Sequence, residues 1–263
     1  MLKGLYTAYS GMVNEQNRMD VLTNNLANSA TTGYKAEGAT SQSFDAMLAY
    51  RIKDEEDGFA GGVHIGHNNP GVKIGETYTD YAQGSFRETG NTYDIALSGE
   101  GFFTIEYTDR SGETSTMYTR DGAFTLTKEG YLVTKDGDFV LGRGNNGESV
   151  HIQIDPTHEA SIDTSGRIVQ NGQVIGQLQV TDFEDYNYLE HYGENFFRPV
   201  EGAEIVESSA TIRSGYLEAS NVQVVREMVE LISVTRQYES NQKILQAYDE
   251  TLQISVNELG KIY

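Results

Sequence analysis

The chain has 263 residues, enough for one large domain or two smaller ones. Its 39 acidic residues against 19 basic ones give a formal net charge of −20, which argues against nucleic acid and anionic membranes as partners because both require clustered Lys and Arg. The absence of Cys excludes disulfides and Cys-ligated metals.

The N-terminal segment has apolar residues at helical spacing and no Pro to interrupt them. This stripe consists of Leu2, Leu5, Tyr9, Met12, Met19, Leu22 and Leu26. Gly33 is expected to end the helix. The first residues contain neither a basic stretch nor a continuous apolar one, so we expect no secretory signal peptide. Nothing in the chain reaches transmembrane length, and we expect no direct membrane insertion.

Residues 36–80 are expected to form an extended connector between the first helix and a β domain. Within them, residues 54–76 are polar and rich in Gly, which is typical of loops.

Residues 81–217 change to a period of two, which predicts an acidic antiparallel β domain. Short apolar runs alternate with pairs in which Gly follows a polar residue, as primed hairpin turns require. These pairs are Asp121-Gly122, Glu129-Gly130, Asp136-Gly137, Ser165-Gly166 and Asn171-Gly172.

The C-terminal segment predicts a second, longer helix, with no Gly or Pro between Val222 and Leu259 and with Gly260 as its stop. Residues at alternating steps of three and four run through several heptads: Met228, Leu231, Thr235, Tyr238, Gln242, Leu245, Asp249, Leu252, Val256 and Leu259. Val222, Val225, Val229 and Ile232 thicken the stripe at its start. A helix of about 40 residues spans about 60 Å, a length typical of coiled coils. The polar members of the stripe weaken an isolated dimer and favour several neighbours.

Charge is distributed unevenly along the chain. Residues 1–37 carry three basic and three acidic residues, and residues 222–263 carry four and six. The middle, residues 38–221, carries 12 basic and 30 acidic residues, a net charge of −18. This partition indicates a solvated middle and ends that contact neighbours.

One glycine-rich motif resembles a dinucleotide-binding loop. Residues 142–147 match G-x-G-x-x-G after an apolar run, but that function needs a helix to follow. Residues 148–154 alternate like a strand instead, so the motif is interpreted as a turn.

Candidate catalytic and metal-binding groups are sparse. His64 and His67 are separated by two residues but lie in a Gly/Asn-rich loop without a carboxylate at fixed spacing. The segments 109–113 and 136–138 lack the spacing of a calcium loop and are interpreted as turns. An aromatic cluster over residues 186–197 favours a half-buried β surface or a subunit contact over a ligand cage. We therefore expect no enzyme activity, no cofactor, no metal and no small-molecule substrate.

Several motifs, in order along the chain, resemble the bacterial flagellar rod and hook family. The N-terminal signature is Asn24-Asn25-Leu26-Ala27-Asn28 with Thr32-Gly33-Tyr34-Lys35. Similar central motifs are Gly99-Glu100-Gly101-Phe102-Phe103 and Tyr118-Thr119-Arg120-Asp121-Gly122. Towards the C-terminus they are Gly215-Tyr216-Leu217-Glu218-Ala219-Ser220-Asn221 and Arg236-Gln237-Tyr238-Glu239-Ser240-Asn241. The length favours a rod subunit, proximal or distal, over the longer hook protein.

The resemblance implies a structural subunit of the drive shaft between the motor and the hook in the flagellar basal body. It implies export through the flagellar type III apparatus without a cleaved signal. It also implies assembly with copies of itself and with rod, hook and ring subunits. A different hypothesis stays open at this point, a secreted β-domain binding module that its terminal helices oligomerise. A hydrolase that uses His64, His67 and a neighbouring acid is the weakest hypothesis.

Together these patterns predict an α+β fold in which long terminal helices pair as a coiled-coil-like module beside a central antiparallel β domain. The expected parts are a helical assembly module of residues 1–35 and 218–263, the connector 36–80 and the β domain 81–217. The residues predicted to serve assembly and helix packing are Leu5, Met12, Met19, Leu22, Asn24, Asn25, Leu26, Asn28, Met228, Leu231, Tyr238, Leu245, Leu252 and Leu259. For the run from Asn24 to Asn28, contacts between subunits are favoured over ordinary helix capping.

Overall fold

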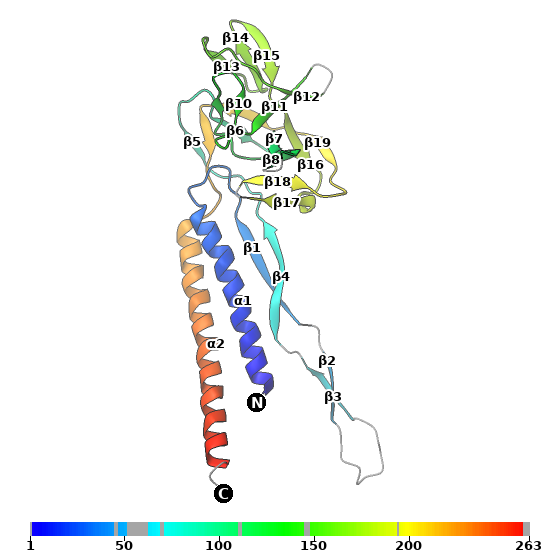
Figure 1. Cartoon of the computed structure of the whole chain (residues 1–263), viewed down its shortest axis with the longest axis vertical. Coiled ribbons are helices and arrows are strands. Elements are labelled where there is room, and N and C mark those ends of the chain that lie inside the picture. The colour runs from blue at the N-terminus through cyan, green and yellow to red at the C-terminus, as the bar shows by residue number, and fades with distance from the viewer. Residues whose placement is uncertain are drawn as a thin grey trace. The chain divides into compact units, whose positions relative to one another are not determined.

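A computed structural model describes residues 2–44, 47–51, 63–68, 71–109, 112–144, 148–193 and 195–259. The chain divides into two compact units. The helical unit comprises Met1–Ala27, Glu37–Asp80 and Gln223–Tyr263, and the β unit comprises Asn28–Ala36 and Tyr81–Val222. Two helices and a central antiparallel β domain confirm the predicted α+β class (Figure 1).

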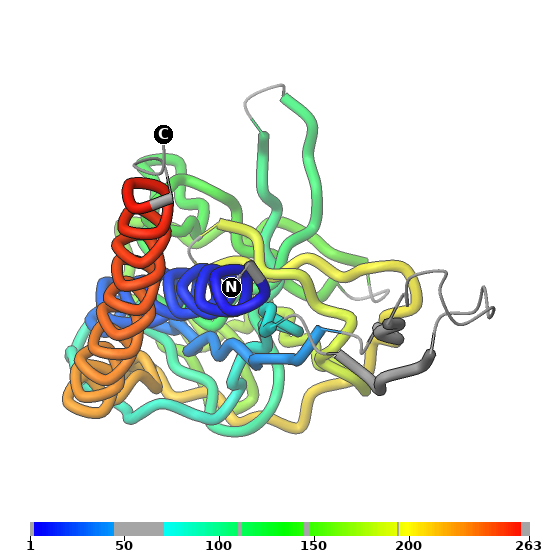
Figure 2. Tube along the Cα trace, turned by 90° about the horizontal axis from the view of Figure 1, so that it is seen from below, coloured from blue at the N-terminus to red at the C-terminus, as the bar shows by residue number. Residues whose placement is uncertain are grey.

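In its described residues the helical unit contains two helices and four strands. These are α1 (Leu2–Ala27), β1 (Glu37–Ser43), β2 (Met47–Arg51), β3 (Val63–Asn68), β4 (Val72–Thr79) and α2 (Val224–Leu259). The two helices run antiparallel, and the start of α1 and the end of α2 both face the viewer in Figure 2. The helix α1 lies between α2 and the β1–β4 pair (Figure 1). Among the described residues, neither helix has the length and apolar character to cross a bilayer.

Both helices differ from expectation at one end. The first ends at Ala27, before the Gly33 that was predicted to stop it. Gly33 instead adopts φ +70° within the β unit, where an added Cβ would overlap the backbone between Arg120 and Asp121. Position 33 therefore requires glycine because another backbone segment approaches it closely, and not because it caps a helix. Gly260, the predicted stop of α2, lies outside the described residues.

The expected connector is largely paired strand in its described part. Strand β1 pairs antiparallel with β4 from Glu37↔Thr79 to Ser43↔Val72, and β2 pairs with β3. The β1–β4 pair packs against α1. This tertiary contact favours strands in a stretch whose polar sequence predicted a loop.

The β unit contains seventeen strands in its described residues, all in antiparallel pairs. They are β5 (Phe86–Glu88), β6 (Ile95–Ser98), β7 (Phe102–Thr108), β8 (Thr114–Thr119), β9 (Thr125–Leu126), β10 (Leu132–Val133), β11 (Phe139–Arg143), β12 (Ser149–His151), β13 (Ala160–Ile162), β14 (Arg167–Gln170), β15 (Gln173–Gln177), β16 (Val180–Phe183), β17 (Leu189–Tyr192), β18 (Phe196–Pro199), β19 (Ile205–Glu207), β20 (Thr211–Ser214) and β21 (Tyr216–Glu218), with a 3-10 helix η2 (Tyr186–Tyr188).

The principal sheet of this unit has ten strands. Its main path runs β17-β18-β8-β7-β11-β10-β9, while β12 adds to β11, and β16 joins β7 to β19. A three-stranded sheet β13-β14-β15 and the pairs β6–β20 and β5–β21 complete the unit.

The alternation along β7 divides the apolar interior into two clusters. Phe103 and Ile105 point into the larger one, which gathers aliphatic residues from β6 to β20. Phe102 points to the other face and packs with Tyr118 and Phe197 in an aromatic cluster. The aromatic segment 186–197 contributes to this second cluster, as the prediction of a half-buried β surface requires.

The pairs Asn171-Gly172 and Asp121-Gly122 require glycine for different structural reasons. Asn171 and Gly172 have φ values of +52° and +77° in the two-residue loop between β14 and β15, which confirms the predicted primed hairpin. Gly122 does not have a positive φ, so the turn predicted there is wrong. It lies so close to the Ile95 carbonyl that any Cβ would overlap it.

The interpretation of the G-x-G-x-x-G motif as a turn is supported by its flanking strands. Strands β11 and β12 pair antiparallel on either side of it, and Gly144 N donates to Glu148 O at 2.7 Å. Residues 145–147 lie outside the described residues. The dinucleotide site would need a helix where the chain forms β12.

A buried ion pair joins the two segments by which the chain enters and leaves the β unit. Lys35 Nζ lies 2.7 Å from Glu218 Oε1 and donates to the Ala82 carbonyl at 2.9 Å. Glu218 also accepts from the Gly84 backbone N–H at 2.9 Å, and Arg120 lies 3.4 Å from its second oxygen. These contacts hold residue 35 against residue 218 although the chain between them builds most of the unit.

Candidate assembly surface

One face of α2 packs against α1. Its less exposed side chains recur at alternating steps of three and four: Leu231, Val234, Tyr238, Asn241, Leu245, Tyr248 and Leu252. The predicted stripe shares Leu231, Tyr238, Leu245 and Leu252 with this set. Between them it contains Thr235, Gln242 and Asp249, each one residue after the position that faces α1. Gln242 and Asp249 are exposed, because the helix turns Asn241 and Tyr248, one residue earlier, towards Gly11 and Gly4 of α1. Val256, near the end of the helix, is exposed as well.

Two glycines of α1, seven residues apart, face the larger side chains of this stripe. A Cβ at Gly4 would overlap the Tyr248 hydroxyl, and one at Gly11 would lie 3.1 Å from Asn241 Nδ2. The absence of side chains therefore lets the two helices approach closely at these levels. The pairs Gly4 with Tyr248 and Gly11 with Asn241 fix the antiparallel register of the helices.

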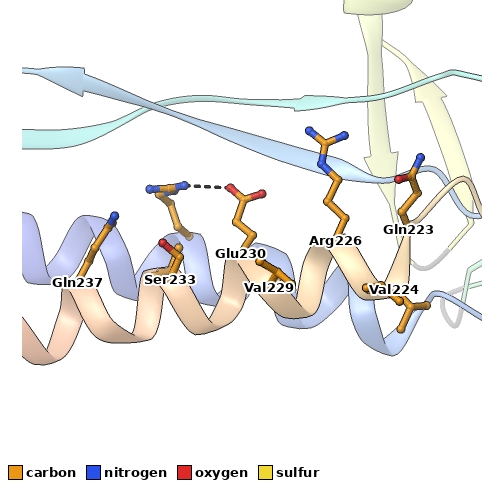
Figure 3. A pocket seen from close by; sticks show the side chains of 10 residues that line it. Gln223, Val224, Arg226, Val229, Glu230, Ser233 and Gln237 are labelled. Atoms are coloured by element: carbon orange, nitrogen blue, oxygen red, sulfur yellow. Dashed lines mark hydrogen bonds and ion pairs between the residues drawn. The ribbon is translucent and has the colours of Figure 1, made fainter.

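An ion pair links the helices at a third level. Arg18 lies 3.1 Å from Glu230 of α2 and 3.2 Å from Glu15 of its own helix. In Figure 3 the dashed line at the Glu230 carboxylate marks this ion pair, on the side of Glu230 away from Arg226. The three side chains are partly exposed, so the pair contributes orientation more than stability.

Asn25 is almost fully buried and connects α1 to the first strand. Its Nδ2 donates to the Glu37 carbonyl at 2.7 Å, and its Oδ1 accepts from the Glu37 backbone N–H at 2.9 Å. The same amide lies 3.5 Å from the Glu227 carboxylate of α2. Its amide thus serves contacts within the chain, an internal role that the sequence prediction did not include.

The other predicted assembly residues are distributed over several environments. Leu22 is buried, and half-buried are Leu5, Met12, Met19, Leu26, Asn28, Leu231, Tyr238, Leu245 and Leu252. Asn28 lies in the β unit, where Thr31 N donates to its carbonyl. Asn24 is exposed, and Met228 is exposed away from the face that packs on α1. The side chain of Leu259 lies outside the described residues.

The first half of α2 exposes an apolar ridge, defined as Val225, Met228, Val229 and Ile232. Val225 is 77% exposed, the highest value among the large apolar residues of the described chain. A depression of about 760 Å³ lies alongside it, lined by residues of this helix, by Gln223 just before it and by Arg18. Figure 3 shows Val224 and Val229 at its wall. Such a concentration of exposed apolar side chains marks a surface for another protein.

A second apolar surface lies between α1 and the β1–β4 pair. This groove, of about 440 Å³, is lined by Tyr6, Tyr9, Ser10, Val13, Asn14, Asn17, Phe44, Val72, Lys73 and Ile74. Tyr6 and Tyr9 are more than half exposed. Among its described lining residues only Lys73 carries a charge, with Nζ 6.0 Å from the centroid of the Phe44 ring.

Sequence reasoning missed the groove because its lining comes from three separate segments of the chain, residues 6–17, Phe44 and residues 72–74. Tyr9 was visible as a member of the α1 stripe, but Phe44 and Val72 stand in a polar stretch. The ridge gave a clearer signal, since Val225, Val229 and Ile232 repeat on one face of α2. It was assigned to the packing stripe, whereas the structure places it on solvent.

The polar clusters of the described residues offer no assembled catalytic or metal centre. No group of three His, Asp or Glu side chains among them could hold a metal ion. The His151–Glu106 and His158–Asp155 pairs are both exposed, and the segment 136–138 forms a turn. In the segment 109–113, residues 110 and 111 lie outside the described residues. His64 and His67 belong to β3, and their side chains lie outside the described residues.

Three protein-family models match parts of the chain in both units. Residues 5–35 match the model described as flagella basal body rod protein, and residues 213–259 match the C-terminal model of the flagellar basal body rod FlgEFG proteins. Residues 96–175 match the D1 domain model of the flagellar hook proteins FlgE/F/G.

Curated relatives extend the match over the whole chain. The flagellar basal-body rod protein FlgG of Bacillus subtilis (strain 168) is 34% identical, over 98% of this chain and 99% of the relative. The chain belongs to the flagellar basal-body rod protein family. Another member, the rod protein FlgF of Caulobacter vibrioides, is 31% identical over the full length of both chains. Similarity to rod proteins named FlgG and FlgF at nearly equal identity assigns the chain to the family and not to one of these types.

Proposed function

We propose that this chain is a structural subunit of the flagellar basal-body rod, located in the basal body between the motor and the hook. The observation that carries the proposal is similarity over nearly its whole length to relatives named as basal-body rod proteins. The role is mechanical and not enzymatic, which agrees with the names of those relatives.

The chain polymerises through its terminal helices, which pair as a coiled-coil-like module. Supporting this are the antiparallel packing of α1 on α2 and the two exposed apolar surfaces of the helical unit. This packing involves apolar residues of both helices: Leu5, Met12, Met19 and Leu22 of α1, and Leu231, Tyr238, Leu245 and Leu252 of α2. A single helix pair leaves part of its apolar surface exposed to water, and neighbouring subunits bury that remaining surface.

The partners are copies of this chain and the rod, hook and ring subunits that adjoin it. Export by the flagellar type III apparatus brings it to the site of assembly. An exposed apolar ridge on a chain of net charge −20 fits a subunit that reaches its neighbours by polymerising, since the charge keeps the free chain soluble.

Deletion of the gene in a motile host tests the function. We expect the deletion to abolish swimming, and we expect a plasmid copy to restore it and to place the chain in purified basal bodies. A copy that lacks residues 226–263 is the matched variant, and it should be produced but should neither enter basal bodies nor restore swimming. Normal swimming after clean deletion would contradict the role and favour the secreted binding module.

A further inference from the structure

We infer that the groove between α1 and the β1–β4 pair receives the last turns of α2 from a second copy of this chain. The inference rests on the proposed function and names the contact by which one subunit holds the next. It follows from the apolar lining of the groove, from a buried acceptor within it and from the acidic helix end that projects beyond α1.

The helix end in question, residues 249–259, is called the overhang here. The helix α2 has 36 residues and α1 has 26. Because Gly4 lies opposite Tyr248, α2 packs on the first residues of α1 as far as Leu252 and then passes the start of α1, as the lower end of Figure 1 shows. The overhang exposes Ile254 and Val256, the latter to 69%. It therefore carries apolar groups that the single chain leaves in water.

The groove and the overhang agree in length and in apolar character. The α1 wall runs from Tyr6 to Asn17, which spans about 17 Å at ~1.5 Å per residue. The overhang has eleven residues and spans about 16 Å by the same rise. The groove is lined mostly by aromatic and branched aliphatic side chains, which match Ile254 and Val256 in character.

The groove contains one hydrogen-bond acceptor without a partner among the described residues. Asn14 is 3% exposed, and its Nδ2 donates to Ser41 Oγ at 3.0 Å. Its Oδ1 is buried and accepts no hydrogen bond from the described chain. A buried acceptor left in this state costs about 1–3 kcal/mol. Because Oδ1 is covered in the single chain, the overhang amides of Gln253 and Asn257 reach it when the Asn14 side chain turns towards the groove.

Charge selects the overhang over the ridge as the occupant. The overhang carries Asp249, Glu250 and Glu258 and no basic residue. Lys73, the charged residue of the groove, is complementary to that acidic helix end. The ridge of Val225, Met228, Val229 and Ile232 stands among two basic and two acidic residues, Arg226, Arg236, Glu227 and Glu230. Its charges balance, so the purely acidic overhang is the better complement to Lys73.

The contact cannot be satisfied within one chain and does not close on itself. The overhang continues α2 as one helix past the start of α1, so it projects from its own groove. Groove and overhang are different surfaces, so each copy offers one and fills another. Such a heterologous contact propagates into an open row of subunits.

Disulfide trapping tests the contact, because the natural chain contains no Cys. The full-length double variant Tyr9→Cys/Ile254→Cys is oxidised both as concentrated purified protein and in basal bodies from a host that lacks the natural gene. We expect a ladder of covalent dimers, trimers and longer species in at least one preparation. Mixing the two single variants should give dimers only.

Two matched pairs identify other occupants. The variant Tyr9→Cys/Val225→Cys places the second thiol on the ridge, and Tyr9→Cys/Val174→Cys places it on an exposed residue of the β unit. Both should give at least tenfold less ladder than the overhang pair. A dominant ladder from the ridge pair, dimers from Tyr9→Cys alone, or no ladder from the overhang pair in either preparation would overturn the inference.

A charge exchange provides the second readout. In the overhang pair, Lys73→Glu should lower the ladder yield about fivefold, and adding Glu258→Lys should restore it. Failure of the exchange to restore the yield would speak against this orientation. Trapping and swimming test the two proposals separately. If the chain enters basal bodies and restores swimming but gives no ladder, the groove contact is refuted and the rod function stands. If the purified protein gives the ladder but the gene can be deleted without loss of swimming, the contact stands and the rod function is refuted.

Discussion

Lys35 and Glu218 stand 183 positions apart in the chain, yet their side chains form an ion pair of 2.7 Å. The side chains are 1% and 0% exposed, and the carboxylate also receives Gly84 N–H and lies near Arg120. Each end of the β unit therefore supplies one partner of the pair. The pair therefore links the first and last segments of the unit directly.

Lys35→Ala should lower the free energy of unfolding by about 3 kcal/mol, because the buried carboxylate loses its closest cation. Urea unfolding followed by near-ultraviolet circular dichroism of the aromatic cluster would measure it. The exposed pair Arg143–Glu207, at 2.7 Å, is the control, and Glu207→Gln should cost less than about 1 kcal/mol. Equal effects of the two substitutions would show that burial does not govern the Lys35 pair.

Two glycines should respond differently to Ala. Gly122→Ala forces a Cβ into the Ile95 carbonyl and should cost about 3 kcal/mol or more of unfolding free energy. Gly172→Ala meets no atom within 4 Å, so its cost is that of φ +77° alone, about 1 kcal/mol. Chemical denaturation of both variants would test this order. A larger loss for Gly172→Ala would refute it.

The packing face of α2 should be more sensitive to truncation than its ridge. Val234 is 1% exposed, and Val234→Ala should destabilise the helical unit by about 2 kcal/mol through lost burial against α1. Val225→Ala, on the ridge, should change stability by less than about 0.5 kcal/mol in the free chain. Thermal melting followed by far-ultraviolet circular dichroism would compare them. Similar melting of both variants would mean that α2 does not pack on α1 in solution.

Two carboxylates of the β unit should give opposite pH dependences. Burial raises the pKa of Asp138 above its ordinary value, and hydrogen bonds from Thr108 and Thr134 only partly oppose it. Because the folded pKa exceeds the unfolded one, the stability that this group contributes is present at low pH and is lost as pH rises through the folded pKa. Asp138→Asn should therefore raise the free energy of unfolding at pH ~7 and have little effect near pH ~3.5.

Asp155 is the matched contrast. Hydrogen bonds from the Thr157 hydroxyl and backbone lower its pKa, so its contribution is present above the unfolded pKa and is lost as pH falls through the folded one. Asp155→Asn should reduce stability at neutral pH, and the difference should shrink in acid. Urea midpoints at several pH values would measure both variants, and the same sign for the two at neutral pH would contradict the assignment.

Local periodicity predicted the elements that depend on local rules. The heptads of α2 and the Asn171-Gly172 hairpin follow from spacing and from the preference of that dipeptide for positive φ. The phase of the α2 stripe did not follow, because Leu231, Tyr238, Leu245 and Leu252 belong equally to two alternating patterns. Only the partner helix selects between them, through Gly4 and Gly11 opposite Tyr248 and Asn241.

By itself, the sequence determined the fold class, the family and the two terminal helices, because each rests on residues that are neighbours or a few turns apart. The tertiary structure decided which faces remain open. The groove between Tyr9 and Phe44, the close approach that requires Gly33 and the ion pair of Lys35 with Glu218 each join distant segments. No local pattern encodes such a pairing, since its free energy arises only when the two segments exclude water from each other.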